Sequence, residues 1–196
     1  MLYSTEFDGS ENPLSEGGVW RNEGLDWTKV QKLDGVAFGT QSGTKGNDDS
    51  YAHLAMTVAG WPLDVEVSAA IYMPVPIIGG THEVELLLRW SDAPHVAKGY
   101  EVLLSYGGEV QIIRWNGPLA DFTPIGSSGI HSGLKDGDVF SATIVGPVIS
   151  AFVNGALIAQ ATDTRHVGGS PGIGFFRRAS GTNFQFGLKN FTTTDL

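Results

Sequence analysis

Two glutamates, Glu83 and Glu85, stand one residue apart in the segment EVELLLRW. Alternate residues of an extended chain point to the same side, so their carboxyl groups are expected roughly 6.5–7 Å apart along the backbone. Two carboxyl groups can serve as acid and nucleophile in glycoside hydrolysis, where retaining enzymes use a separation of about 5–5.5 Å. Glu83 with Glu85, or Glu85 with Glu66, are therefore candidate catalytic pairs. The competing interpretation is an acidic face that is solvated or paired with arginine.

A wider set of residues could bind a sugar without any catalysis. An aromatic ring can stack on the C–H face of a pyranose, while carboxylate, amide and guanidinium groups bind the hydroxyl groups. These residue types predict a ligand-binding surface made of Glu85, Arg89, Glu101, Gln111 and Trp115. The alternative for Trp115 is that its indole packs under the glycine- and serine-rich segment 121–135, which is predicted to be a rim loop.

The segment from Thr81 to Pro118 must position these residues, and its pattern predicts three consecutive antiparallel strands. Gly107-Gly108 predicts a tight turn between the second and third strands, because glycine reaches positive φ without steric cost. In the first strand the period of two sends one set of side chains into a core and the other set away from it. The inward set is Val84, Leu86, Leu88 and Trp90, and the outward set is Glu83, Glu85, Leu87 and Arg89.

The rest of the chain also consists of short strand patterns separated by turn residues. Asp34-Gly35 and Asn154-Gly155 are strong hairpin signals, residues 63–73 form a long alternating strand, and residues 138–162 form a meander. Helix signals are nearly absent. About thirteen short strands without crossover helices must pack sheet against sheet. We therefore predict an all-β, two-sheet antiparallel jelly-roll sandwich, with one domain over residues 1–196.

Composition excludes several classes of function. The formal net charge is -9 and the chain has no cysteine, which excludes disulfides and thiolate metal sites. The negative charge would repel a phosphate backbone, so no nucleic-acid partner is expected.

No apolar stretch approaches the roughly 18–20 residues of a membrane span, so no membrane insertion is expected either. The opening residues lack a basic segment followed by an apolar one, so no signal peptide is predicted within the chain. Nothing in the pattern sets an oligomeric state.

The later turns and core positions resemble a known group of proteins. The resemblance rests on Gly137-Asp138-Val139, Val153-Asn154-Gly155, Ala161-Thr162-Asp163-Thr164, Gly172-Ile173-Gly174-Phe175-Phe176 and the phenylalanine-rich terminal strand. In these features the chain resembles the concanavalin A-like lectin/glucanase superfamily, in particular laminin-G-like jelly rolls of bacterial, environmental and phage proteins. The resemblance covers residues 63–196 best and favours an extracellular or phage-particle location.

This resemblance implies several activities, because the fold hosts lectins, carbohydrate-binding modules, glycosidases and structural domains. Glucanases of the superfamily carry an E-x-D-x-x-E pattern on such a strand. Here the middle acid is Glu85 and the third position is Leu88. No cofactor is implied as a requirement. A structural calcium between the terminal strands is implied as possible, with Glu6 and Asp8 as its candidate ligands.

These observations favour a carbohydrate-binding or structural module that binds an oligo- or polysaccharide on the sheet containing residues 81–115. The first alternative is a glycoside hydrolase that uses the paired glutamates. The second is a purely structural domain of an extracellular or phage assembly.

Overall fold

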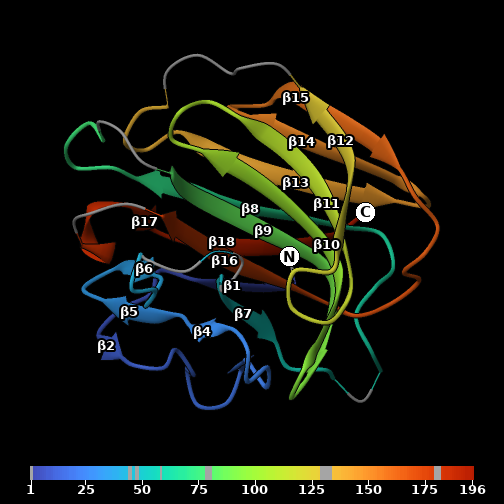
Figure 1. Ribbon diagram of the computed structural model, residues 1–196, viewed down its shortest axis with the longest axis horizontal. Helices are drawn as coiled ribbons and strands as arrows, with labels where there is room; N and C mark the ends of the chain where they lie inside the picture. The colour runs from blue at the N-terminus through green and yellow to red at the C-terminus, as the bar shows by residue number, and fades with distance from the viewer. Residues whose placement is uncertain are drawn as a thin grey trace.

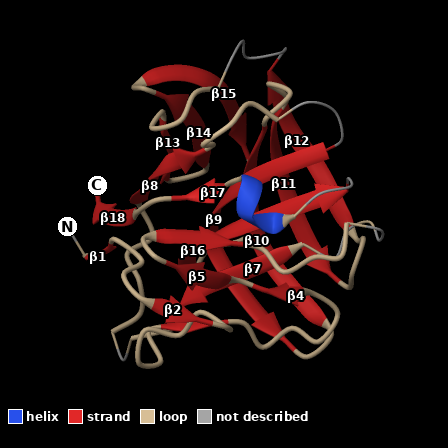
Figure 2. Cartoon of the chain, turned by 90° about the vertical axis from the view of Figure 1, so that its left-hand side faces the viewer, coloured by secondary structure: helices blue, strands red, loops and turns tan. Residues whose placement is uncertain are grey.

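The computed structural model describes residues 2–43, 46, 49–57, 59–77, 81–128, 134–178 and 182–196. In this part of the chain, strands make up almost all of the regular structure, and one short 3-10 turn, η1 (Asn183–Gln185), is the only helical element (Figure 2). The strands form two sheets that pack against each other (Figure 1). The predicted all-β jelly-roll sandwich is confirmed.

The first sheet contains the long strand and the meander that the pattern predicted. Its main path runs in the order β15 (Ala156–Thr162), β14 (Val148–Val153), β13 (Val139–Val145), β8 (Val65–Tyr72), β17 (Gly187–Leu188), β6 (Val36–Phe38), β5 (Gln31–Leu33) and β2 (Ser10–Glu11). Off this path, β18 (Phe191–Asp195) pairs with both β8 and β1 (Tyr3–Thr5). The first and last strands of the chain therefore lie side by side.

The second sheet contains the three strands that carry the candidate residues. Its order is β12 (Phe122–Ser128), β11 (Val110–Gly117), β10 (Val96–Ser105), β9 (Thr81–Ala93), β16 (Ser170–Arg178), β7 (Ser50–Leu54) and β3 (Trp20–Arg21). The pairs along this path are antiparallel, and the short β4 (Thr28–Lys29) adds to β7 in parallel. Strands β9 to β12 form the curved band in the upper part of Figure 1.

The core between the sheets follows from strand alternation. Along β8, buried and half-buried residues alternate without a break from Val65 to Tyr72. Val84, Leu86 and Leu88 of β9 enter the same core from the second sheet. Both predicted hairpin turns have positive φ angles at their two central residues, as type I′ turns require. The angles are 49° at Asp34 and 86° at Gly35 in the first turn, and 51° at Asn154 and 78° at Gly155 in the second.

One segment differs from its prediction. The expected rim loop 121–135 contains strand β12, which pairs with β11, so that prediction is wrong over residues 122–128. The segment resembles a loop because it is rich in glycine and serine. Close packing explains the glycine at position 126, because a Cβ there would lie 2.9 Å from the Cβ of Ala161 in β15. Residues 129–133 lie outside the described residues.

No helix in the described ranges combines the length and the apolar character needed to span a bilayer.

Candidate functional site

A β-bulge interrupts the alternation of β9 just after Leu88. Tyr100 of β10 faces Leu88, but Lys98 faces Ser91, so Arg89 and Trp90 together lie opposite Gly99. Arg89 has a φ of 48°. The extra residue shifts the alternation by one position, so that Arg89 and Trp90 each point to the side opposite to the one expected for an unbroken strand. The prediction that Trp90 points into the core and Arg89 away from it is therefore wrong.

Arg89 lies away from the other predicted binding residues and holds connecting segments in place. It is 6% exposed, and its Nε and Nη2 donate to the carbonyl oxygen of Leu63 at 3.1 and 2.8 Å. Its Nη1 donates to the carbonyl of His166 at 3.1 Å, and Nη2 also donates to that of Gly146 at 2.9 Å. Asp64 pairs with it at 3.5 Å. We assign Arg89 a structural role on this basis.

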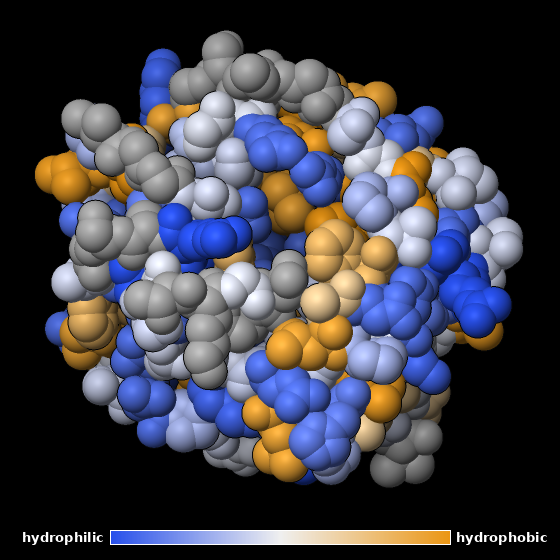
Figure 3. Space-filling view, viewed as in Figure 1, coloured by the Kyte–Doolittle hydropathy of each residue, from blue (hydrophilic) through white to orange (hydrophobic). Residues whose placement is uncertain are grey.

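The other predicted residues do share the side of the second sheet that faces away from the core, here called the outer face. The register places Glu101 between Leu87 and Ile113, and Glu85 between Leu103 and Gly174. A hollow of about 180 Å³ opens here, called the outer-face hollow, and Figure 3 shows a depression in the face that carries it. Its lining is Asp49, Glu83, Glu101, Leu103, Gln111, Ile113, Trp115, Phe122 and Phe176.

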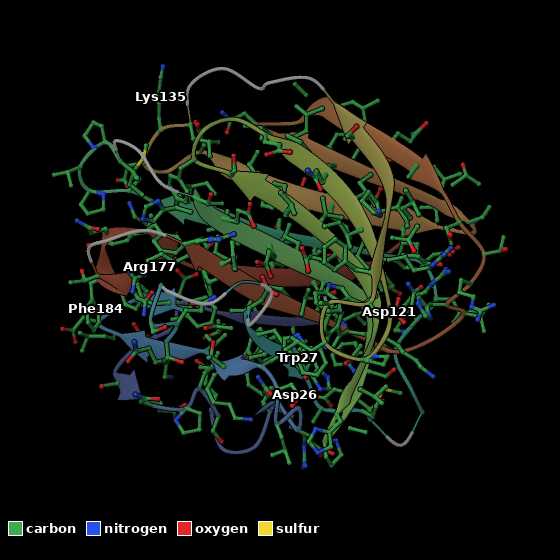
Figure 4. The ribbon with its side chains drawn as sticks, in the orientation of Figure 1. Asp26, Trp27, Asp121, Lys135, Arg177 and Phe184 are labelled. Atoms are coloured by element: carbon green, nitrogen blue, oxygen red, sulfur yellow. The ribbon has the colours of Figure 1, made fainter. Side chains whose placement is uncertain are left out.

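Aromatic rings form one wall of the hollow. Trp115 is only 3% exposed, and its ring lies 5.4 Å from that of Phe122 and 5.7 Å from that of Trp27. Its Nε1 donates a hydrogen bond to Oε2 of Glu101 at 2.6 Å. Trp27 lies below the band of β9 to β12 in Figure 4, where Asp121 marks the turn before β12. Trp115 is thus buried, as its alternative interpretation expected, but it packs beside its cross-strand partner Phe122 and against Trp27 and not under a rim loop, and it still lines the hollow.

The carboxyl groups of Asp49, Glu83 and Glu101 also line the hollow, and Glu85 lies next to them in the sheet without being one of the lining residues. Glu85 and Glu101 are 1% and 4% exposed, Asp49 is buried, and Glu83 is half-buried. Burial, followed by the nearby Asp49 and Glu109, raises the pKa of Glu83 to about 8. Burial is also the main reason why the pKa values of Glu85 and Glu101 lie well above the usual range, and neighbouring carboxyl groups add to it. These three glutamates therefore favour the protonated form at neutral pH.

Five residues that line the hollow were not among the predicted site residues: Asp49, Leu103, Ile113, Phe122 and Phe176. Asp49 ends the polar segment 41–49, whose pattern indicates only a loop, and it reaches the hollow through tertiary packing. Phe176 follows core residue Phe175 in β16, so strand alternation does point it to the outer face. That alternation was the available signal for Phe176, whereas no local signal exists for Asp49.

Three further candidates do not belong to this site. Glu66 alternates with core residues Val65 and Val67 of β8, so it faces outward from the first sheet, on the opposite side of the core from Glu85. The predicted catalytic pair of Glu85 with Glu66 is therefore wrong.

Glu6 and Asp8 are exposed on either side of buried Phe7, and no group of three or more His, Asp or Glu in the described residues could hold a metal ion. The calcium site with Glu6 and Asp8 as candidate ligands therefore stays a prediction.

A serine, a histidine and an aspartate meet elsewhere on the outer face. His53 Nδ1 lies 2.7 Å from Ser170 Oγ, and its Nε2 lies 3.0 Å from Asp92 Oδ1. Ser170 is fully buried, however, and its hydroxyl also donates to the carbonyl of Trp90 at 3.3 Å. A nucleophile must reach its substrate. The trio therefore serves as a polar link between β7, β9 and β16.

No protein-family model and no curated protein sequence matches the chain. Among solved structures, the carbohydrate-binding module CBM66 from Bacillus subtilis has 13% identity and a TM-score of 0.66, with 92% of this chain and 98% of that chain covered. The exoplasmic/lumenal domain of VIP36 in a Ca²⁺/Man₃GlcNAc-bound form has 8% identity and a TM-score of 0.62, with 96% and 91% covered.

A structure reported with endo-acting O-glycanases of the human gut microbiota has 13% identity and a TM-score of 0.59, and the match covers 100% of this chain and 99% of that chain. Identities this low establish the fold alone, and the fold hosts both binding and hydrolysis. The resemblance predicted from the turns and core positions is confirmed at that level: the chain has the jelly-roll fold of the concanavalin A-like lectin/glucanase superfamily.

Proposed function

We propose that the protein is a carbohydrate-binding domain that holds a sugar residue of an oligo- or polysaccharide in the outer-face hollow. The observation that carries this proposal is that Glu101, Gln111 and Trp115 line one hollow together. A carboxyl group and an amide can bind sugar hydroxyl groups, and aromatic rings can cover the C–H face. At about 180 Å³ the hollow is smaller than the ~300–1,000 Å³ of drug-sized pockets, which suits a single sugar ring.

The similar structures support this proposal by their stated ligands. The module from Bacillus subtilis is named as carbohydrate-binding, and the VIP36 domain was solved with Man₃GlcNAc. The purely structural alternative instead predicts self-association without glycan binding. Sedimentation velocity over a range of protein concentrations distinguishes the two: self-association with no glycan retained would replace our proposal by the structural one.

We expect Gln111→Ala to weaken glycan binding about 3- to 10-fold, because it removes a hydrogen bond worth roughly 0.5–1.5 kcal/mol. Gln111 is half-buried, and its side-chain amide bonds to Glu109. Its loss should therefore leave the melting temperature nearly unchanged. The measurement is mobility in native gels that contain mannan, laminarin or glycol chitosan.

Gln160→Ala is the matched control for this experiment. Gln160 is exposed on β15 of the first sheet and donates to Ser150 Oγ at 2.9 Å. Its loss should not change mobility in any gel. Equal effects of the two variants would place glycan binding outside the outer-face hollow.

For the hydrolase alternative, we expect no reducing ends from the same glycans at pH 7. A glycosidase needs one protonated and one ionised carboxyl group. The hydrolase alternative uses Glu83 and Glu85, and both of them favour the protonated form, so this pair lacks the ionised partner. A reducing-sugar assay checks this. Release that disappears in Glu83→Gln would support hydrolysis instead.

A further inference from the structure

Resting on the proposed function, we infer that the outer-face hollow selects a sugar residue that carries an acetamido group, such as an N-acetylhexosamine unit of a glycan. An acetamido group presents an amide N–H donor, a carbonyl acceptor and a methyl group. Four residues on the neighbouring strands β10 and β11, here called the floor of the hollow, offer a partner for each of these three features.

Two polar and two apolar residues alternate on the floor. Glu101 of β10 lies opposite Ile113 of β11, and Leu103 lies opposite Gln111. All four line the hollow, and Leu103 and Ile113 are only 4% and 5% exposed. The polar pair therefore occupies one diagonal and the apolar pair the other, and diagonal neighbours in a sheet lie roughly 7–8 Å apart. This arrangement places a hydrogen-bonding group at each of two opposite corners, with an apolar patch between them.

The hydrogen bond between Trp115 and Glu101 decides which oxygen of Glu101 can donate. The indole Nε1 is only a donor, and it bonds to Oε2 of Glu101 at 2.6 Å. Burial raises the pKa of Glu101, so its carboxyl group carries a proton at neutral pH, and with Oε2 accepting, that proton belongs on Oε1. No hydrogen bond joins Oε1 to a described residue, although Glu101 is only 4% exposed and lines the hollow. This O–H can therefore donate to the carbonyl oxygen of a ligand.

Gln111 supplies the complementary acceptor at the opposite corner. Its Nε2 donates to Glu109, so its side-chain carbonyl oxygen remains for an N–H donor. The N–H and the carbonyl of a trans amide point in opposite directions, as partners at two opposite corners require. With the amide placed in this way, its methyl group lies over Leu103 and Ile113.

The apolar diagonal distinguishes an acetamido group from other substituents of sugars. A hydroxyl, ammonium or carboxylate group over Leu103 and Ile113 would lose hydrogen bonds to water without replacing them, which is costly. A methyl group there is stabilised by burial instead. Trp115 and Phe122, which line the same hollow, can cover the C–H face of the attached ring.

The test is an NMR titration of the protein at pH 6.5 with N-acetylglucosamine, glucose and glucosamine. The indole N–H of Trp115 and the side-chain amide of Gln111 report on binding in the hollow, because both residues line it. We expect N-acetylglucosamine to bind at least about 10-fold more tightly than either of the other sugars, because two hydrogen bonds and one buried methyl group add to its affinity.

Two variants of Glu101 test the O–H donor. Glu101→Gln should keep the preference within about 3-fold of its original value, because an amide also donates to a carbonyl and accepts from Trp115. Glu101→Met should reduce the preference to less than about 3-fold. Glu66→Met, on the outward side of the first sheet, is the matched control and should keep the full preference. If Glu101→Gln loses the preference as completely as Glu101→Met, a neutral donor at this position is overturned.

The outcomes separate this inference from the proposed function. Equal binding of the three sugars in the hollow would overturn the acetamido preference and leave carbohydrate binding intact. Binding of none of them would overturn the inference, and it would overturn the proposed function as well if the glycan gels leave the mobility of the unmodified protein unchanged. A parallel titration with N-methylacetamide tests the sugar ring itself. If this simple amide binds as tightly as N-acetylglucosamine, recognition of a hexosamine is overturned.

Discussion

Glu85→Gln is expected to raise the free energy of unfolding at pH 7 by on the order of 2 kcal/mol and to change it little at pH 4. Burial raises the pKa of Glu85 in the folded protein, whereas unfolding returns it to about 4.5. Between these two values the folded state binds more protons than the unfolded state, so stability falls as pH rises. Each pH unit in that window costs about 1.4 kcal/mol. Glutamine has nearly the same shape and does not ionise, so this loss disappears.

Urea unfolding at intervals from pH 4 to pH 8 measures the effect. The comparison at pH 4 isolates the cost of placing an amide in the buried site, because Glu85 is then protonated in the folded state. Glu66→Gln controls for removal of a carboxyl group from an outward position of β8. If the stability curves of Glu85→Gln and the unmodified protein run parallel over this range, the carboxyl group is not held protonated by burial.

Strand alternation was sufficient to predict which residues share the outer face. Glu83, Glu85, Glu101 and Gln111 lie on the face that the period of two assigned to them, because side-chain direction depends only on position along an unbroken strand. The prediction failed at Arg89, where the bulge adds a residue. A signal was present in the sequence, since Gly99 interrupts an otherwise strand-like segment, and such glycines often mark bulges.

Alternation does not predict how deeply the outer face is covered. Trp115 was placed on the correct side, but its burial depends on Phe122 and Trp27, which come from segments without a local signal for this contact. Asp49 joins the acids for the same reason. These features arise from long-range packing, so one sequence alone could indicate a polar and aromatic surface but not its enclosed hollow.

Gly99→Ala is expected to lower the free energy of unfolding by at least about 3 kcal/mol. Gly99 has a φ of 144°, and a Cβ there would lie 2.8 Å from Cα of Trp90 and 2.9 Å from the carbonyl oxygen of Arg89. Backbone strain at such a position costs of order 1–3 kcal/mol, and overpacking against rigid main chain typically adds a similar amount. Because the bulge directs Trp90 to the outer face and Arg89 away from it, the substitution should also change tryptophan fluorescence.

Gly137→Ala separates the close approach from the backbone strain. Gly137 has a φ of 86° in a turn, and no atom lies within 4 Å of a Cβ built there. Its substitution should therefore cost only about 1–2 kcal/mol, the penalty of a left-handed conformation, and should leave tryptophan fluorescence unchanged. Urea unfolding of both variants at one pH gives the comparison. Equal losses would mean that β10 can move away from the bulge, and the separation of Arg89 from the acids would then not depend on Gly99.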